Sequence, residues 1–158
     1  METMEARMVK LYARNNNHVA LHAIPGHFAT SHSHINFYID MTSLKTRANE
    51  AQEVAKSLAG DYVNSTVVDT IVCMDGTEVV GAYLAQEFEK RGFRNTYLHD
   101  TIYVVTPEYN ANNQLIFRDN TIPAIKGKNV ILLLATTTTG LTVRRSLECV
   151  QYYGGTVR

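Results

Sequence analysis

The feature that most constrains this fold is a run of five bulky apolar residues, residues 130–134. The run is too short for an independent helix, and it lies between a Gly/Lys turn and a Thr/Gly cluster. These boundaries predict a strand that is buried on both faces. Strands of this kind belong to parallel sheets, because helices cover both faces of such sheets.

Hydroxyl side chains and a glycine follow this strand directly, and a helix is expected to begin near residue 142. The glycine can adopt a positive φ, and a helix N-terminus attracts anions, so the loop offers hydroxyls, amides and a helix dipole to a phosphate. A solvated turn, with a threonine as helix cap, is the alternative that stays open. The predicted phosphate-binding residues are Thr136, Thr137, Thr138, Thr139, Gly140 and Thr142.

Composition and charge narrow the classes of function. The chain has 158 residues, 45% of them hydrophobic, so one globular domain with its own core is expected. Fifteen basic side chains balance fifteen acidic ones. The neutral balance gives no basic face for nucleic acid or for an anionic membrane, and no apolar run approaches membrane-spanning length. The Gly-x-x-x-x-Gly-Lys-Ser/Thr spacing is absent, which leaves nucleoside-triphosphate hydrolysis without support.

Cysteine usage predicts a reducing, cytoplasmic compartment. Cys73 and Cys149 lie far apart, neither has a CxxC partner, and no signal-type segment is visible near the start of the chain. Metal binding and redox exchange through these thiols are therefore not expected.

The first 42 residues are predicted to form a small unit outside the main sheet. Residues 5–14 have a helical pattern, which a run of asparagines ends. Residues 18–40 mix aromatic and β-branched side chains with a Pro25-Gly26 turn signal, which predicts strands joined by turns.

Residues 43–158 alternate helix and strand patterns. Apolar residues recur three and four apart over residues 46–59, which predicts an amphipathic helix that Gly60 closes. Residues 67–74 predict a strand, and after a tight loop a helix extends to about residue 91. Strand composition returns over residues 97–105.

The last third of the chain begins with a predicted flap at about residues 106–120, because the polar tip at residues 110–113 separates two strand-like segments. The central strand, the threonine loop and a helix to Gly154 follow. Residues 156–158 resemble the start of another strand, so a fragment or an unusually short protein is expected. The order of elements predicts a single α/β domain: a parallel sheet flanked by helices, with an N-terminal hood and a flap hairpin.

Three segments of the chain resemble the type I phosphoribosyltransferases, and within them the orotate phosphoribosyltransferases. Residues 26–40 are similar to the hood segment, and residues 74–81 to the loop that holds the pyrophosphate end of phosphoribosyl pyrophosphate. Residues 130–142 resemble the family signature, which is an apolar strand, two acids, two variable residues and Thr-Thr-Gly. The resemblance implies phosphoribosyl transfer to a pyrimidine-like base, a magnesium cofactor and a homodimer.

The chain departs from the family at two places. Alignment on Thr138-Thr139-Gly140 puts Leu134 and Ala135 at the two acidic positions, which in the family grip the ribose hydroxyls. The flap has neither Lys nor His at residues 106–113, where the orotate enzymes carry a basic catalytic loop. The resemblance thus implies a phosphate cradle without the ribose grip.

The second candidate loop is open to two interpretations. The resemblance makes it the pyrophosphate loop, whereas an ordinary strand-to-helix turn, with a threonine cap and a glutamate in the first helical turn, explains it equally well. Its residues are Asp75, Gly76, Thr77 and Glu78.

Other candidate residues also have a structural alternative. Tyr38 and Phe37 are candidates for stacking on a base, but aromatics in a short strand are more often core residues. His32 and His34 share one side of a strand without a third ligand nearby, so we expect solvated histidines and assign no metal site. Three arginines are candidate cations: Arg118 for the flap, and Arg144 and Arg145 for the phosphate. Solvated surface positions are the alternative for all three.

Two functions follow from these patterns. The first is a phosphoribosyltransferase of the orotate type, acting by positioning and electrostatics, with no catalytic residue assigned. The second is a non-catalytic sensor that binds a phosphosugar or a nucleotide. In both cases the partner is a small molecule.

Overall fold

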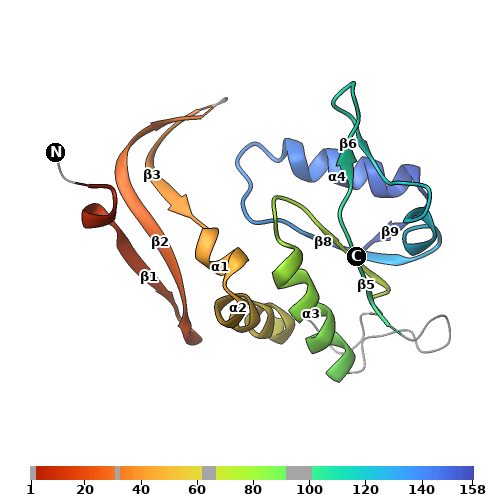
Figure 1. Cartoon of the computed structure of the whole chain (residues 1–158), viewed down its shortest axis with the longest axis horizontal. Helices are drawn as coiled ribbons and strands as arrows, with labels where there is room; N and C mark the ends of the chain where they lie inside the picture. The colour runs from red at the N-terminus through yellow and green to blue at the C-terminus, as the bar shows by residue number, and fades with distance from the viewer. Residues whose placement is uncertain (1–2, 31–32, 62–66, 92–100) are drawn as a thin grey trace.

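The computed structural model of the chain describes residues 3–30, 33–61, 67–91 and 101–158 (Figure 1). Three antiparallel strands form the N-terminal hood in the order β1-β2-β3: β1 Val9–Ala13, β2 Asn16–Ala29 and β3 His34–Asp40. Figure 1 places this sheet beside the rest of the molecule, with β3 leading into the first helices. The predicted hood is therefore a separate small sheet.

The helix predicted over residues 5–14 is wrong. A single 3-10 turn, η1 Glu5–Arg7, precedes β1, in which Leu11 lies opposite Leu21 of β2. An isolated helix of ten residues is marginal in water, and long-range strand pairing overrides the local pattern here.

The turn predicted at Pro25-Gly26 is also wrong. Strand β2 continues through both residues, Pro25 lies opposite Phe37, and the register shifts between Pro25 and Phe28. Proline is tolerated there because a β-bulge does not need its missing N–H.

The main sheet is parallel, as predicted, with the strand order β5-β4-β8-β9. Its strands are β4 Thr70–Cys73, β5 Tyr103–Val105, β8 Asn129–Leu133 and β9 Thr156–Val157. Strand β9 confirms that the last residues pair with the sheet. Part of the strand predicted over residues 97–105 lies outside the described residues, and β5 is its described part.

The helix predicted over residues 46–59 is α2 Ala48–Asp61, which begins two residues later than predicted, and a short helix that was not predicted, α1 Thr42–Thr46, precedes it across the extended residue Arg47. The amide of Thr42 donates to Asp40 Oδ1 at 2.9 Å and begins α1. Hydrogen bonds from Thr42 hold the pKa of Asp40 below its ordinary value. Gly60 lies within α2, so the glycine cap predicted there is wrong.

The remaining elements follow the predicted order. They are α3 Glu78–Lys90, the flap strands β6 Glu108–Tyr109 and β7 Leu115–Ile116, the 3-10 turn η2 Ile122–Ala124 and α4 Leu141–Tyr152. No helix in the described part of the chain is long and apolar enough to cross a membrane.

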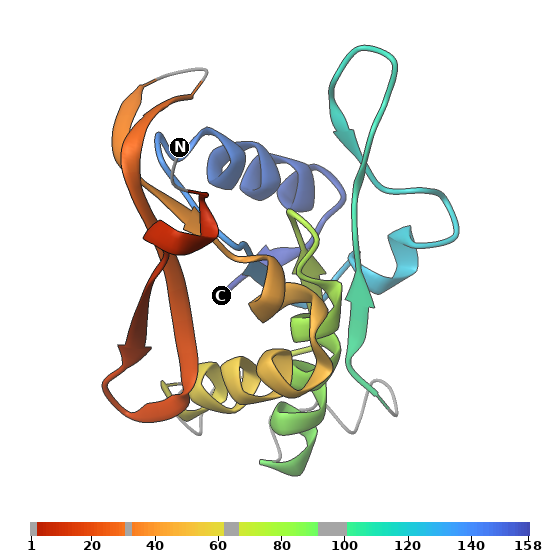
Figure 2. The same ribbon diagram turned by 60° about the vertical axis from the view of Figure 1, so that its left-hand side comes forward.

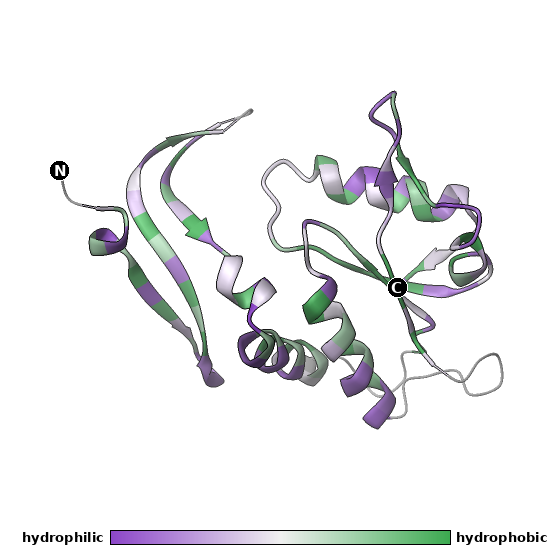
Figure 3. Cartoon of the chain, in the orientation of Figure 1, coloured by the Kyte–Doolittle hydropathy of each residue, from purple (hydrophilic) through white to green (hydrophobic). Residues whose placement is uncertain are grey.

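Helices cover both faces of the main sheet (Figure 2). Alternate residues of β4 and β8 point to opposite faces, as the pleat requires. Ile71 and Ile131 pack with α2 and α3, whereas Val72 and Val130 pack with α4 and the flap. Residues of β8 thus pack in clusters on both faces of the sheet, which confirms the prediction for this strand, and Figure 3 shows the hydropathy of the sheet strands.

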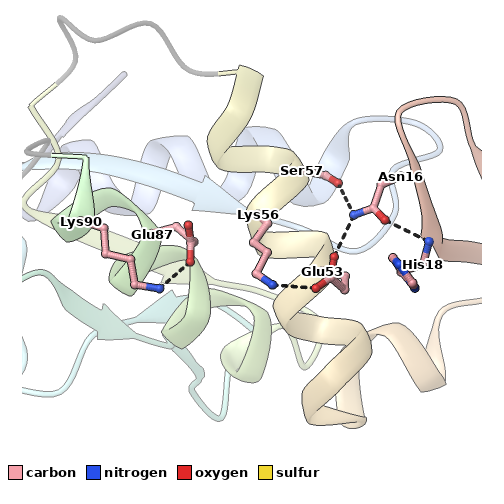
Figure 4. A network of polar contacts seen from close by, with 7 residues as sticks. All are labelled: Asn16, His18, Glu53, Lys56, Ser57, Glu87 and Lys90. Carbon is pink, nitrogen blue, oxygen red and sulfur yellow. Dashed lines mark hydrogen bonds and ion pairs between the residues drawn. The ribbon is translucent and has the colours of Figure 1, made fainter.

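Side chains of α2 fasten the hood to the core (Figure 4). Asn16 Nδ2 at the start of β2 donates to Glu53 Oε2 at 3.1 Å and to Ser57 Oγ at 3.2 Å, while its Oδ1 accepts from the amide of His18. Hydrogen bonds from Lys56 and Asn16 hold the pKa of Glu53 below its ordinary value. The hood is thus held against α2, which itself packs on the main sheet.

Candidate functional site

The threonine loop lines a cavity of about 280 Å³ at the carboxyl end of β8. The structure brings all six predicted phosphate-binding residues into this cavity, together with Asp75 from the loop after β4. The lining residues are Asp75, Thr136, Thr137, Thr138, Thr139, Gly140, Leu141 and Thr142. Because β4 and β8 are parallel neighbours, their carboxyl ends meet at this edge.

The backbone at the start of α4 is left open to an acceptor. Gly140 has φ 77° and ψ 4° and no side chain caps the helix, which begins with a bond from Arg144 N to Gly140 O of 2.9 Å. The amide of Leu141 has only a long contact of 3.4 Å with Thr139 Oγ1. Exposed hydroxyls beside the first amides of a helix suit an anion, because the helix dipole adds positive potential there.

The loop after β4 contributes one carboxylate to this cavity. Asp75 and Gly76 both have positive φ, 57° and 74°, which turns the chain sharply. The carbonyl of Asp75 accepts from Lys45 Nζ at 2.7 Å, so an ammonium group of α1 fixes the loop from the other side.

Thr77 is a structural residue of this loop. Its side chain is buried, and Oγ1 lies 2.8 Å from Met74 O and 3.1 Å from Leu133 O. The hydroxyl therefore ties the end of β4 to the end of β8, and it makes no cap hydrogen bond to α3. Thr77 therefore stands at the N-cap position of α3 without capping it through its side chain, and neither Thr77, Gly76 nor Glu78 lines the cavity. Glu78 accepts instead from Thr106 Oγ1 at 3.1 Å.

Leu134 and Ala135 occupy the two positions where the family has acids, and they directly precede the threonine loop. They line an apolar pocket of about 200 Å³. Helices α1, α2 and α3 form the rest of its wall, through Met41, Leu44, Val54, Leu58 and Val80 among others. Lys45 is the charged residue in its lining. Sequence reasoning did not find this pocket, since its walls come from segments far apart in the chain.

The two aromatic candidates lie on β3 and do not line the threonine cavity. They point to opposite faces of the hood sheet, as neighbours on a strand do. Tyr38 packs on Phe28, with ring centroids 5.8 Å apart, while Phe37 is 53% exposed. Neither aromatic is enclosed as a core residue.

The flap forms the predicted hairpin and packs on α4. Asn110 Oδ1 accepts from the amides of Asn112 and Gln114 at its tip, and Cys149 Sγ donates to Leu115 O at 3.4 Å. A cavity of about 340 Å³ lies between the flap tip and α4. The flap is therefore anchored on the far end of α4 from the threonine loop.

The three arginine candidates are all directed away from the threonine cavity. Arg118 Nη2 pairs with Glu108 at 2.6 Å within the flap, a bond that raises the pKa of Arg118. Arg144 Nε pairs with Glu148 at 2.9 Å along α4. Arg145 lines the cavity under the flap.

The cysteines are buried and unreactive in character. Burial raises the pKa of Cys73 to about 12 and that of Cys149 to about 11. Both thiols stay protonated near neutral pH, which suits packing and not nucleophilic chemistry.

No protein-family model matches the chain, and no curated protein matches it. Among solved structures, it is similar to the orotate phosphoribosyltransferase of Mycobacterium tuberculosis H37Rv in complex with Fe(III) dicitrate. The TM-score is 0.52 and the identity 16%, over 87% of this chain and 73% of that one. The same enzyme in complex with inorganic phosphate gives a TM-score of 0.51 at 15% identity, over 85% and 70%.

The adenine phosphoribosyltransferase of Leishmania donovani is also similar, with a TM-score of 0.52 at 18% identity, over 78% of this chain and 56% of that chain. Two enzymes named for different bases thus share this arrangement of sheet and helices. The parallel sheet, its covering helices and these similarities lead to one conclusion: the chain has the fold of the type I phosphoribosyltransferases.

Proposed function

We propose that this protein binds the phosphate of a phosphorylated ribose in the threonine loop and acts as a phosphoribosyltransferase of the orotate type. The observation that carries the proposal is the cavity of about 280 Å³, where threonine hydroxyls surround the start of α4. A similar fold is known in complex with inorganic phosphate, which supports an anion as ligand. The pyrimidine-like base rests on the hood resemblance alone.

The chemistry required of the residues is positional. The base nitrogen forms a bond to C1 of the ribose as the bond from C1 to pyrophosphate breaks, and the electron pair leaves with pyrophosphate. Donors held in place around the 5′-phosphate would orient the sugar for this displacement. A homodimer and a cytoplasmic location complete the proposal, both from the family resemblance and the cysteine pattern.

Magnesium fits one feature of the cavity. Mg²⁺ prefers oxygen ligands and is often held by one or two carboxylates plus substrate phosphates. Asp75 supplies a carboxylate to the threonine cavity and is the residue that would hold the ion. When bound, magnesium would neutralise the negative charge of the donor's phosphates.

A non-catalytic sensor for a phosphosugar or a nucleotide is the second candidate. The observation that favours it is the apolar pocket at Leu134 and Ala135, where the family grips the ribose. A hydrogen bond to a charged group contributes about 1.5–3 kcal/mol, so the loss of two carboxylates weakens the hold on a ribose diol about a hundredfold or more.

Calorimetric titration with phosphoribosyl pyrophosphate, with and without Mg²⁺, tests the proposed binding. We expect magnesium-dependent binding tighter than about 0.1 mM, which corresponds to about −5.5 kcal/mol. Gly140→Val should abolish it, because a β-branched residue is strained at φ 77°. Gly127→Val is the matched control, since Gly127 has φ 72° and equally open surroundings at the opposite end of β8. Equal binding by the wild type and Gly140→Val would reject the loop as the site.

Pyrophosphate release in the presence of orotate or uracil separates the two candidates. Release by the wild type supports the transferase. If only the double variant Leu134→Asp, Ala135→Asp releases pyrophosphate, the natural protein is a sensor. The variant's melting temperature must be followed, because two new carboxylates next to an apolar pocket also cost stability.

A further inference from the structure

Two histidines meet at the end of the hood hairpin. His27 lies on β2 and His34 on β3, and a hydrogen bond of 2.8 Å joins His27 Nε2 and His34 Nδ1, so one of the two nitrogens carries a proton. The ring centroids are 4.9 Å apart and the ring planes are inclined by 39°. Both side chains are exposed, so solvent and ions reach the pair.

The β-bulge in strand β2 sets this encounter. Pro25 lies opposite Phe37, but three residues later Phe28 lies opposite Ile35, so β2 has one extra residue between them. His27 occupies the bulge, and bulges commonly redirect a side chain. The resulting neighbour of His27 is His34, seven positions along the chain. The sequence had placed His34 only with His32, which lies outside the described residues.

The backbone on both sides of the pair is held in place. Thr30 N donates to Ser33 O at 2.8 Å, and Ser33 N donates to Thr30 Oγ1 at 2.9 Å. Ala29 pairs with His34 in the ladder itself. The two rings are thus presented by a clamped hairpin, which reduces the entropy lost when both bind one ligand.

We propose that His27 and His34 chelate a divalent transition-metal ion through these two nitrogens. Nitrogens about 2.0–2.1 Å from one ion lie about 2.9 Å apart at a right angle and about 3.3 Å apart at the tetrahedral angle. The hydrogen-bonded separation of 2.8 Å is close to the right-angle value, and chelation replaces this hydrogen bond when the ring that donates it shifts its proton to its other nitrogen. Adjacent positions of tetragonal Cu²⁺ or Ni²⁺ fit this spacing better than tetrahedral Zn²⁺ does, with water completing the coordination.

This site is independent of the threonine cavity and of the proposed function. Neither histidine lines that cavity. The described residues contain no group of three or more His, Cys, Asp or Glu that could hold a metal, so the inferred site is a two-ligand chelate on the surface. A bound ion would join β2 to β3 at the hairpin end.

The test is a calorimetric titration of the tag-free protein with CuCl₂ and with NiCl₂ in a buffer that does not bind metals. We expect one equivalent to bind, with Cu²⁺ tighter than Ni²⁺ as the general affinity order requires. His27→Ala and His34→Ala should each weaken binding at least tenfold, because the second ligand then no longer acts intramolecularly. The bound Cu²⁺ should give an electron paramagnetic resonance spectrum with two nitrogen ligands, and with one in either variant.

His18→Ala is the matched control, since His18 is an exposed histidine on the same strand. It should leave the affinity and the spectrum unchanged. Circular dichroism checks that each variant is folded, and the ion should raise the melting temperature of the wild type and of His18→Ala only. Affinities of the two pair variants within twofold of the wild type, or an equal loss in His18→Ala, would overturn the proposal.

Discussion

Two loops end neighbouring parallel strands and differ in what holds them. The loop after β4 is fixed by the protein, through the buried hydroxyl of Thr77 and the ammonium of Lys45. The loop after β8 exposes the side chains of Thr136 to Thr139 and has an uncapped helix behind it. Threonines thus stand in both loops with opposite roles.

The difference shows that burial decides what a hydroxyl beyond the end of a strand does: Thr77 is buried, whereas Thr136 to Thr139 are exposed. Thr77 follows a strand whose residues are all buried, and its hydroxyl satisfies backbone carbonyls within hydrogen-bond reach. The threonines after β8 are exposed to solvent, where an anion can accept hydrogen bonds from them. The first loop provides the frame, and the second provides the donors.

The largest expected effect concerns the thiols behind the two loops. Cys73 ends β4, and Cys149 lies on the helix after the threonine loop. A raised pKa means fewer thiolates: with a pKa of about 12, only about one Cys73 in 10,000 is ionised at pH 8, against about a quarter of free cysteines. Iodoacetamide should therefore alkylate the native protein at least a hundredfold more slowly than the unfolded protein, with Cys73 the slower residue. Labelling of Cys73 at the rate of a free thiol would contradict its place behind the fixed loop.

The next effect separates the two kinds of threonine by isosteric substitution. Thr77→Val removes the hydroxyl that joins β4 to β8, and we expect a loss of about 1 kcal/mol in the free energy of unfolding. Thr138→Val, at an exposed position of the cavity, should change stability by less than about 0.5 kcal/mol. Urea unfolding measures both.

Phosphoribosyl pyrophosphate binding should give the opposite ranking. Thr138→Val removes a donor from the cavity and should weaken binding about tenfold or more, in keeping with one lost hydrogen bond to a charged group of about 1.5–3 kcal/mol. Thr77→Val should retain most of the affinity, once measured where the variant is fully folded. Equal effects of the two substitutions in both assays would abolish the distinction between frame and donors.

Sequence reasoning predicted the parts of this edge that depend on local pattern. The apolar run, the threonines and Gly140 lie together along the chain, so the strand, the loop and the start of α4 could be predicted from them. Helix α3 and the flap hairpin were predicted for the same reason.

Features that depend on distant residues could not be predicted. The hydroxyl of Thr77 bonds to Leu133, fifty-six positions away, and the apolar pocket joins three helices to the end of β8. Strand β1 exists because β2 pairs with it, although its sequence alone resembles a helix. Helix α1 and the extended Arg47 after it were not predicted, because Leu44 continues the apolar periodicity of the helix that follows.

The smallest expected effect concerns Lys45, whose ammonium group holds the loop after β4. Lys45→Met keeps the apolar stem that lines the pocket and removes the ammonium that holds the Asp75 carbonyl at 2.7 Å. We expect a loss of about 0.5 kcal/mol in unfolding free energy, since the bond is partly solvated. Affinity for phosphoribosyl pyrophosphate should fall two- to threefold, because a positive charge beside the cavity is lost while the Asp75 carboxylate remains. Lys126→Met, an exposed lysine before β8, should alter neither quantity. If both lysine variants weaken binding equally and the effect disappears at 0.5 M salt, Lys45 contributes only to the general charge of the protein, and the loop after β4 is held without it.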